Sequence, residues 1–342
     1  MKSNITPSIQ EKIGRNLHNL KNHPIEIIKR KIYDYFGESF SKFDNLEPKV
    51  NVSENFDKLL IPSDHPARAA SDTYYFDENN VLRTHTSAHQ NELLNNGYKS
   101  FLVTGDVYRK DEIDSCHYPV FHQMEGVHVF ENGEDAQKEF LKVLDGLVNH
   151  LFPGCEYRIN EDYFPFTNPS LEVEVKFNGK WLEILGGGMV RQEILNNCGI
   201  QDREAWAFGL GLERLAMILF KIPDIRYFWT NDERFIKQFS SGEIIEFKEY
   251  SKYPSCHKDI AFWLNEDYNY NNFCEIVREQ GGDIIEEILK IDEFTHPKTN
   301  RTSHCYRIVY RSNDRSLTNE EVDSIQNKIR EDLQNIMSLE IR

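Results

Sequence analysis

The sequence has no paired cysteines and no long apolar run, and each lack excludes a class of protein. No CxxC pair occurs, which argues against a zinc ribbon or a thioredoxin-type site and favours reduced thiols in a reducing compartment. No apolar stretch reaches the roughly 18 residues that a membrane helix needs, so we expect a soluble chain without a membrane partner. The six scattered cysteines are Cys116, Cys155, Cys198, Cys256, Cys274 and Cys305.

Targeting signals and positive charge are also scarce. The N-terminal MKSNITPSIQ has no apolar segment of a secretory signal and shows no arginine-rich transit peptide. The chain carries 40 Lys and Arg against 56 Asp and Glu, a net charge of −16, which argues against nonspecific binding of nucleic acid over the whole surface. Residues 298–315 are an exception, with five cations and one acid (net +4), although charge alone favours an ordinary solvated strand pair there.

The pattern of apolar residues predicts an α+β fold with an antiparallel sheet. The chain has 342 residues, which suggests about two domains. Hairpins alternate with helices and no βαβ rhythm is visible, as is typical of an antiparallel sheet flanked by helices. We expect helices over 10–36, 86–97, 134–152 and 212–222, a hairpin over 72–84, a short strand or helix over 56–62, and strands over 101–108, 126–130, 155–160, 171–177 and 180–187.

The rhythm changes from Ser251 onward. A strand over 258–264 precedes a helix over 271–280, and IIEEILKIDEF and SHCYRIVYR follow as two strands. A helix over 318–337 starts at an Asn or Thr cap with acids in its first turn, and SLEIR forms a final edge strand. This βαββαβ order predicts a ferredoxin-like domain.

One polar constellation lies in YRKDEIDSCHYPVFHQMEG, residues 108–126. Arg109 stands where the first strand ends, and Gln123 and Glu125 share one face of the returning strand because they are two residues apart. A guanidinium binds phosphate oxygens through two parallel hydrogen bonds, and a glutamate accepts from an amine. A surface ladder of ion pairs explains the spacing equally well.

A second constellation lies in AFGLGLERLAMILF, residues 207–220. Gly209 and Gly211 allow a ligand to approach the backbone, and Arg214 falls in the first turn of an apolar helix. A cation is unfavourable at that end of the helix dipole, so an anion nearby would explain it. A glycine hinge before a core helix accounts for the glycines and leaves Arg214 unexplained.

Two further motifs have plain structural alternatives. In FPFTNP, Phe164 and Phe166 point the same way and could form a slot for a planar apolar group, although core packing is the more common reason for such a pair. In WLEILGGGMV, Glu183 precedes three glycines that could support a flat ligand or form a bulge at a sheet edge. Four histidines could suggest a metal, but they lack a nearby acid cluster, and buried or substrate-contacting roles are favoured: His85, His89, His117 and His122.

Together these segments resemble the class II aminoacyl-tRNA synthetases, and the whole chain is similar to the phenylalanyl-tRNA synthetases. GDVYRKD with HQMEG resembles motif 2 of that class, and GLGLERLAM resembles motif 3. The resemblance runs in order along nearly the entire chain. The stretches that carry it are IGRNLHN, DHPAR, RTHTSAHQ, GDVYR, DSCHYPVFHQMEG, FPFTNPS, WLEILGGGM, AFGLGLERLAM, IPDIRYFW and KYPSCHKDIAFWL.

The resemblance implies how the chain is organised. Residues 1–35 would be an N-terminal helical extension, 36–229 the catalytic domain, 230–250 a linker and 251–342 a ferredoxin-like anticodon-binding domain. Catalytic motifs and that last domain on one chain resemble the monomeric organellar form, which implies a monomer in the mitochondrial matrix. We expect the C-terminal domain to move as a unit and to contact tRNA chiefly through 298–315, so its removal should spare amino-acid activation and abolish charging of tRNA.

The resemblance also implies roles for individual residues. Arg109 would contact the α-phosphate of ATP and Arg214 the γ-phosphate, while Phe164 and Phe166 would meet the substrate's phenyl ring. The other residues that the resemblance places at the substrates are Ser87, Ala88, His89, Gln90, Cys116, His117, Tyr118, Gln123, Met124, Glu125, Glu183, Gly187, Phe208 and Gly209. The chain departs from the usual pattern with Cys116 in the motif 2 loop, with Lys258 before Asp259, and with Gly187 where relatives often have Ala or Cys, a change expected to widen the pocket.

The implied reaction has two steps. The carboxylate of L-phenylalanine attacks the α-phosphate of ATP, and a terminal ribose hydroxyl of tRNA(Phe) then attacks the adenylate. ATP would enter with Mg²⁺, no zinc is expected, and no metal ligands are assigned in the chain. The alternatives are a catalytically inactive synthetase-like RNA-binding protein, which would have lost Arg109, Glu125 or Arg214, and a class II synthetase for another amino acid, which the two phenylalanines disfavour.

The organisation of the chain generates a prediction about fidelity. The catalytic and anticodon-binding parts use residues up to about 230 and from 251, so no stretch remains for a separate editing domain. Because an apolar pocket rejects an added hydroxyl only by a factor of about 10², tyrosine should be activated detectably and tyrosyl-tRNA, once formed, should persist. The measurement is deacylation of preformed tyrosyl-tRNA, and rapid enzyme-dependent hydrolysis would reveal an editing site.

Overall fold

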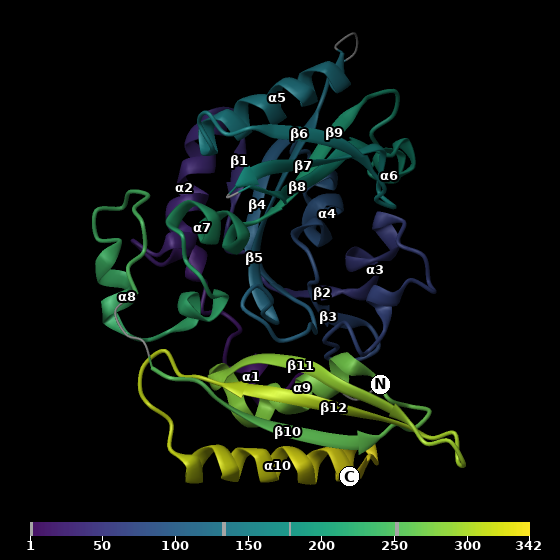
Figure 1. Ribbon diagram of the computed structural model, residues 1–342. Coiled ribbons are helices and arrows are strands. Elements are labelled where there is room, and N and C mark those ends of the chain that lie inside the picture. Colours follow the sequence, from purple (N-terminus) through teal and green to yellow (C-terminus); the bar gives the residue numbers. More distant parts are fainter. Residues whose placement is uncertain (1–2, 132–134, 178, 250–252) are drawn as a thin grey trace.

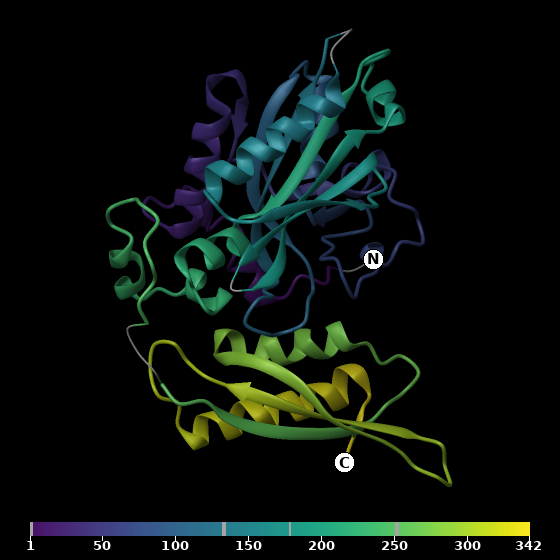
Figure 2. The ribbon, with the colours of Figure 1, turned by 45° about the horizontal axis from the view of Figure 1, so that its top comes forward.

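The computed structural model describes residues 3–131, 135–177, 179–249 and 253–342. A larger unit contains a seven-stranded sheet, and a smaller unit with a four-stranded sheet lies against its lower side (Figure 1). Figure 2 shows α9 (Tyr270–Gly281) on the side of the smaller unit that faces the larger one. The prediction of an α+β fold with helices flanking an antiparallel sheet is confirmed. Gln123 and Glu125 lie on strands of the larger sheet, and Arg109 follows directly after one of them.

The seven strands run in the order β1-β4-β5-β9-β8-β7-β6, and every neighbouring pair is antiparallel except β1 with β4. The predicted strand–loop–strand around Arg109 is confirmed, since β4 ends at Tyr108 and β5 begins at Val120. The strand bounds are β1 Ser41–Phe43, β4 Ser100–Tyr108, β5 Val120–Val129, β6 Tyr157–Asp162, β7 Thr167–Phe177, β8 Lys180–Val190 and β9 Ala205–Gly211.

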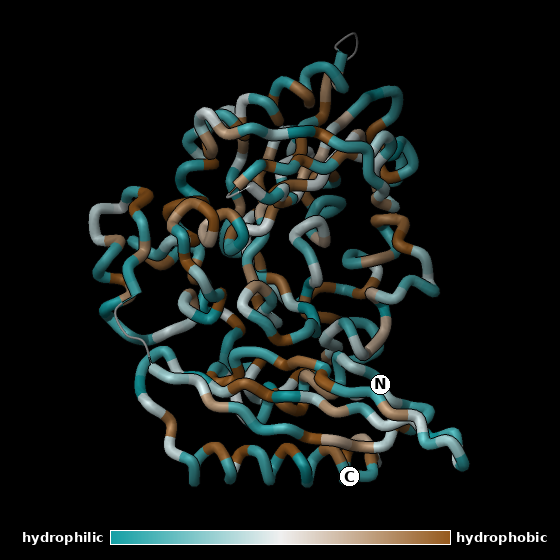
Figure 3. Tube along the Cα trace, viewed as in Figure 1, coloured by the Kyte–Doolittle hydropathy of each residue, from teal (hydrophilic) through white to brown (hydrophobic). Residues whose placement is uncertain are grey.

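The two faces of this sheet have different coverings. On one face, α2 (Pro24–Phe36), α5 (Ala136–Leu151) and α7 (Leu212–Phe220) pack into the main hydrophobic core. The other face meets α4 (Gln90–Asn95) and α6 (Gln192–Asn197) in a smaller core. Figure 3 shows apolar residues concentrated along the sheet and the inner sides of these helices.

The helix predicted over 10–36 is wrong in its first half. The structure has α1 at Pro7–Gln10 and a 3-10 turn at Leu17–Asn19, and the long helix begins only at Pro24. Left-handed backbone at Asn16 (φ 47°) and Asn22 (φ 66°) interrupts the helical path. Pro24 occupies the first helical turn, where it needs no hydrogen-bond partner, and the His23 side chain accepts from the next amide.

Other local predictions need smaller corrections. The predicted hairpin over 72–84 is present but short: the Leu82 amide donates to the Tyr74 carbonyl and the Phe76 amide to the Asn80 carbonyl, both at 2.9 Å. On its other edge, β3 (Asn80–Leu82) pairs with β2 (Lys49–Asn51) from earlier in the chain. Residues 57–59 form a 3-10 turn beside α3 (Val52–Asn55). Strand β9 and helix α6 were not predicted, since the glycines of AFGLG indicated a hinge and not the centre of a sheet.

The ferredoxin-like βαββαβ order is confirmed in the smaller unit. Its sheet order is β11-β12-β10-β13, with β13 at the edge, and it has a hydrophobic core of its own. Thr318 caps the last helix by accepting from the Glu321 amide. The elements are β10 Cys256–Trp263, α9, β11 Ile285–Thr295, β12 Thr302–Tyr310, α10 Asn319–Met337 and β13 Glu340–Ile341.

The expected linker packs onto the larger unit. It contains α8 (Glu233–Gln238), and Phe235, Phe239 and Phe247 are buried in the main core. The N-terminal extension contributes α2 to the same core. The boundary expected at 250/251 lies outside the described residues, so the four-part division of the chain stays a prediction.

Most of the positive charge in 298–315 is neutralised within the smaller unit. Four of its five cations lie within 4.0 Å of a carboxylate, namely Arg301 at Glu340, Arg307 at Asp259, Arg311 at Glu286 and Arg315 at Glu321. A phosphate would have to compete with these acids, which weakens the case for 298–315 as the main contact surface for tRNA. Within the described part of the chain, no helix combines the length and the apolar character needed to cross a membrane.

Candidate active site

A cavity of about 630 Å³ lies on the α4 side of the larger sheet. Alternate residues of a strand point to one face, so Gln123 and Glu125 of β5 share this face with their cross-strand partners Gly211 and Gly209 of β9. An added Cβ at Gly209 would meet nothing within 4 Å, so the glycine leaves the cavity floor open at that point. Ser87, Phe164, Phe166 and Glu183 add further walls.

Glu125 is the buried acid of the cavity. Its side chain is 2% exposed, and Oε2 has no hydrogen-bond partner among the described residues. Burial raises the pKa of this carboxyl from 4.5 to about 8, against a hydrogen bond from Ser87 that lowers it. A cationic group brought into the cavity would favour the charged carboxylate, so the geometry suits recognition of an ammonium.

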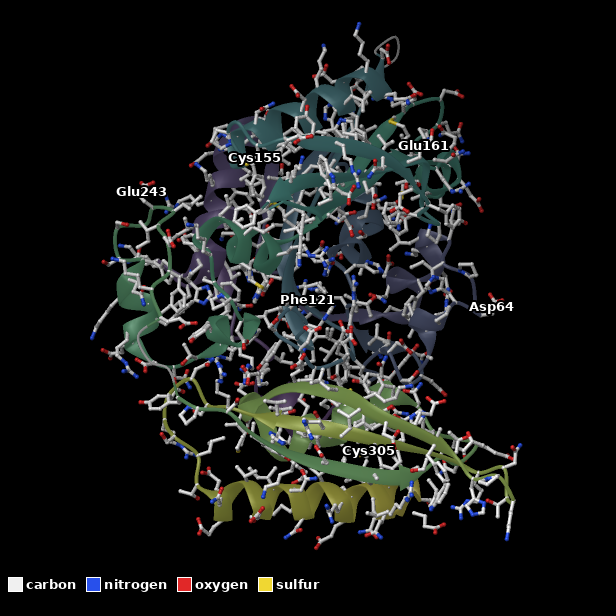
Figure 4. All side chains as sticks on the ribbon, in the orientation of Figure 1. Asp64, Phe121, Cys155, Glu161, Glu243 and Cys305 are labelled. Atoms are coloured by element: carbon white, nitrogen blue, oxygen red, sulfur yellow. The ribbon has the colours of Figure 1, made fainter. Side chains whose placement is uncertain are left out.

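Arg109 supplies a positive charge in the wall of the cavity. It follows the last residue of β4, its Nε donates to the Thr84 carbonyl at 2.8 Å, and its guanidinium lies 5.2 Å from the ring centre of Phe121, which Figure 4 labels. Burial lowers the pKa of the guanidinium. No carboxylate of the described residues forms an ion pair with it, so its charge is available to an anionic ligand. The alternative interpretation of the spacing, a ladder of ion pairs on the surface, is therefore wrong for Arg109 and for the buried Glu125.

Phe164 and Phe166 form the expected aromatic pair. Their rings are stacked with centroids 5.9 Å apart and an angle of 14° between the planes, and both line the cavity. An added Cβ at Gly186 would lie 2.7 Å from the Phe164 ring, so this glycine makes room for it. Phe166 also packs against two hydrophobic cores, so core packing accounts for part of the arrangement of this pair, and its role as a ligand slot stays a prediction.

Gly187 does not widen the cavity in the expected way. An added Cβ would lie 2.6 Å from the Ala207 carbonyl oxygen and 2.9 Å from the Phe208 Cα, so it would point into β9. The expectation that Gly187 widens the pocket is therefore wrong. Its small size instead allows β8 and β9 to approach closely.

Arg214 lies beside Glu183 at the rim. Its Nη1 donates to the Glu183 carbonyl at 3.1 Å and lies 3.5 Å from the carboxylate oxygen Oε2, with both side chains about half exposed. Glu183 lines the cavity. A cation in the first turn of a helix is unfavourable with the helix dipole, and the Glu183 carboxylate compensates for it here. The position of Arg214 in α7 therefore does not by itself require a bound phosphate.

Several expected site residues lie away from the cavity. Ala88, His89 and Gln90 are buried next to it but do not line it, and His89 Nε2 faces Arg83 Nη1 at 2.9 Å. Arg83 is held in turn by Asp106 at 2.6 Å. These residues lie behind the wall that Ser87 belongs to, and their expected contact with the substrates stays a prediction.

Met124 and Phe208 lie on the other face of the sheet. Both belong to the main core, and the Phe208 ring stacks on Phe36 with centroids 5.6 Å apart. Phe208 reaches the cavity only where β9 passes through its wall. The strict alternation of side chains along a strand excludes a direct contact by the Met124 and Phe208 side chains with a ligand on the Glu125 face.

The loop between β4 and β5 is turned toward the smaller unit. Cys116 is exposed, His117 Nδ1 lies 2.8 Å from Asp114, and Tyr118 is buried against Trp229 with ring centroids 5.3 Å apart. None of these three residues lines the cavity. Lys110 and Asp111, from the start of the loop, do.

The structure adds Asn271, which the sequence did not single out, and places His85, which the sequence named only among the four histidines, at the cavity. His85 lines the cavity, and burial and the charge of Arg109 lower its pKa to about 3. Both of its ring nitrogens lack a hydrogen-bond partner among the described residues. The HTS run directly before Ala88 was the available signal. Asn271, which comes from α9 of the smaller unit, could not have been found from sequence.

The histidines do not gather into a metal site. Among the described residues, the group of potential ligands that lies together is Asp111, Glu112 and His117, whose ligand atoms are within 4.8 Å of one another. These side chains are partly or fully exposed, and exposed acids gather in this way without a metal. Four-coordinate zinc would need a further ligand.

Comparisons with known proteins identify the family of the chain. The model of the family "tRNA synthetases class II core domain (F)" matches residues 7–239, and that of "Ferredoxin-fold anticodon binding domain" matches 251–342. The chain belongs to the class II aminoacyl-tRNA synthetases. Within them it belongs with the phenylalanine–tRNA ligases, as its relatives show.

Three relatives illustrate the extent of the match. "Phenylalanine--tRNA ligase, chloroplastic/mitochondrial" of Arabidopsis thaliana is 53% identical, covering 99% of this chain and 83% of its own. "Phenylalanine--tRNA ligase, mitochondrial" of Dictyostelium discoideum is 46% identical, covering 99% and 89%. "Phenylalanine--tRNA ligase alpha subunit" of Vibrio vulnificus is 42% identical over 66% of this chain and 70% of its own. The similarity to the mitochondrial and chloroplastic enzymes therefore includes the smaller unit.

The buried acid of the cavity generates a prediction about pH. In the folded chain Glu125 holds its proton up to about pH 8, whereas the unfolded chain loses it near pH 4.5, so the free energy of unfolding of the wild type should fall as pH rises between these values. Glu125→Gln removes this slope, so its stability relative to wild type should improve by about 4 kcal/mol from pH 4.5 to pH 8, at 1.36 kcal/mol per unit.

Urea unfolding at several pH values measures this difference. Glu161→Gln, on the exposed strand β6 (Figure 4), is the control. The same stability difference at pH 5 and pH 8 would show that the Glu125 carboxyl titrates normally.

Proposed function

We propose that this chain activates L-phenylalanine with ATP and transfers it to tRNA(Phe). One observation carries the proposal. A single cavity combines a stacked aromatic pair with a buried carboxyl and an arginine, neither of which has a partner of opposite charge within the described part of the chain. These groups match the phenyl ring, the ammonium and the phosphate of the reactants.

The amino-acid side of the site is formed by Phe164, Phe166 and Glu125. The aromatic pair takes the phenyl ring, while the Glu125 carboxylate accepts from the ammonium and gives up its proton as the cation arrives. Ser87, which hydrogen-bonds Glu125, and Gln123 complete the polar end. A polar side chain would find no partner at the aromatic pair, which disfavours a synthetase for another amino acid.

The phosphate side is formed by Arg109 and Arg214. An oxygen of the phenylalanine carboxylate attacks the α-phosphorus of ATP, the bond to the β-phosphate oxygen breaks, and pyrophosphate leaves. Charge builds up on the phosphate oxygens, and Arg109 at the α-phosphate neutralises it. Catalysis is then mainly alignment and charge stabilisation, with no proton transfer in this step. ATP enters as its magnesium complex.

The second step uses tRNA(Phe). A terminal ribose hydroxyl attacks the adenylate carbonyl and the ester forms. The bond between the carbonyl carbon and the phosphate oxygen breaks, and AMP leaves with the hydroxyl proton on its phosphate. We place the tRNA anticodon on the ferredoxin-like domain of residues 251–342, and we place the protein, as a monomer, in the mitochondrial matrix. The mitochondrial names of several relatives support the compartment.

The test is ATP–pyrophosphate exchange with each amino acid in turn, without tRNA. Phenylalanine should support exchange far better than any other amino acid, with tyrosine weaker by about 10². No exchange with any amino acid would favour the inactive RNA-binding alternative, and faster exchange with a different amino acid would overturn the substrate assignment.

Arg214→Ala should reduce phenylalanine-dependent exchange by about 10² or more, because the variant loses a charged contact to the ATP phosphates in the transition state. The fold should be retained, since Arg214 is exposed and pairs only at the rim with Glu183. Arg158→Ala is the matched control: Arg158 is another half-exposed arginine paired with a glutamate of the same sheet. Exchange within a few-fold of wild type in folded Arg214→Ala would remove Arg214 from the mechanism.

A further inference from the structure

The loop at residues 109–119 is anchored by the C-terminal domain. Ile113 is 7% exposed and belongs to the hydrophobic core of the ferredoxin-like unit, although it lies between β4 and β5 in sequence. Its carbonyl accepts from the Ile288 amide of β11 at 3.1 Å. The loop therefore begins at the cavity wall and buries its Ile113 side chain in the core of the other domain.

Arg278 of α9 holds the start of this loop. Its buried guanidinium donates through Nη2 to the carbonyls of Asp111 at 2.7 Å and Glu112 at 3.4 Å, and through Nη1 to Glu275 at 2.9 Å. Glu275 also accepts from the Tyr74 hydroxyl at 2.9 Å. Asp111 lines the cavity and is two residues from Arg109, so Arg278 fixes the backbone next to Arg109.

Asn271, the second residue of α9, makes a second contact of this domain with the larger unit. It lines the cavity itself and its Nδ2 donates to Asp72 at 3.4 Å. The Asp72 carbonyl accepts from the Lys110 amide at 2.9 Å. The short segment 109–111 is thus held from two sides by residues of α9.

We propose that Arg278 and Asn271 of the C-terminal domain are positioning residues for amino-acid activation. They hold segment 109–111 so that Arg109 faces the α-phosphate of ATP, and the domain acts in the first step of the reaction as well as on tRNA. This inference rests on the proposed function. A displacement of about 1 Å in a positioning element can cost about 10² in rate. Removal of the domain would also expose Ile113, so truncation at the linker should impair activation, contrary to the expectation from sequence.

The interface offers a matched control. Arg226, in the 3-10 turn Ile225–Trp229, is a buried arginine of the larger unit whose Nη1 donates to the carbonyls of Asp283 and Arg311 at 3.0 Å. Its carboxylate partners are Asp224 at 2.6 Å and, from the smaller unit, Glu286 at 3.7 Å. Arg278 and Arg226 each reach from one domain to backbone carbonyls of the other, but only the Arg278 side chain holds segment 109–111.

The experiment compares Arg278→Met with Arg226→Met in the full chain, by phenylalanine-dependent ATP–pyrophosphate exchange at varied ATP and at varied phenylalanine. Arg278→Met should lower kcat/KM for ATP about tenfold and leave the KM for phenylalanine within about twofold. Arg226→Met should leave both within about twofold. A general loss of folding would not separate ATP from phenylalanine in this way.

The outcomes are distinct. Unchanged kcat/KM for ATP in Arg278→Met, or equal losses in the two variants, would overturn the role of Arg278. If thermal unfolding shows that Arg278→Met does not fold, the Asn271→Ala variant provides the test, because Asn271 is partly exposed and its loss should leave the fold intact. Asn271→Ala should lower kcat/KM for ATP about threefold. An unchanged kcat/KM in this variant would overturn the proposal. Absence of exchange in the wild type would refute the proposed function itself.

Discussion

The candidate site depends on a buried carboxylate that joins a strand to a helix. The ladder between β5 and β9 ends at Gln123 opposite Gly211. One step further, Glu213 Oε2 accepts from the His122 amide at 2.7 Å, while Oε1 lies 2.6 Å from His122 Nδ1. The Glu213 side chain thus takes the place of a backbone partner for His122 of β5, at the point where β9 ends and α7 begins. Because both residues are buried, leaving those donors unpaired would cost about 1–3 kcal/mol each. The pair fixes α7, which carries Arg214, relative to the strand that carries Gln123 and Glu125.

The two faces of the sheet have different roles: one packs in the hydrophobic core and the other lines the cavity. Met124 and Phe208 point into the core under α2, α5 and α7, while Glu125 and Gly209, their neighbours in sequence, face the cavity. The same short strands therefore hold the domain together and present polar groups to a ligand. The polar face can keep a buried carboxyl with an unpaired oxygen because the opposite face provides the stabilising burial.

The sequence predicted the elements with strong local signals. Pro24 at a helix start, the Thr318 cap and the βαββαβ order are local or periodic features, and the structure has them. The helix over 10–36 was wrong because the apolar spacing continues through residues whose backbone is left-handed. Strand β9 was missed because its glycines read as a hinge; it is a central strand because β5 and β8 pair with it from both sides. The first error comes from local backbone conformation, and the second from strands that are distant along the chain.

For the site, the sequence by itself determined which side chains share a strand face, since alternation placed Gln123 with Glu125 and left Arg109 at a strand end. It also determined the pairing of Phe164 with Phe166 and the presence of a second domain. Only the tertiary structure decided that Gly187 faces β9, that His85 lines the cavity while His89 faces Arg83, and that α9 brings Asn271 and Arg278 to the same site. Periodicity orients side chains within one element. The packing of elements from distant parts of the chain decides which of those side chains meet, because burial and hydrogen bonding are satisfied only between surfaces that are complementary in space.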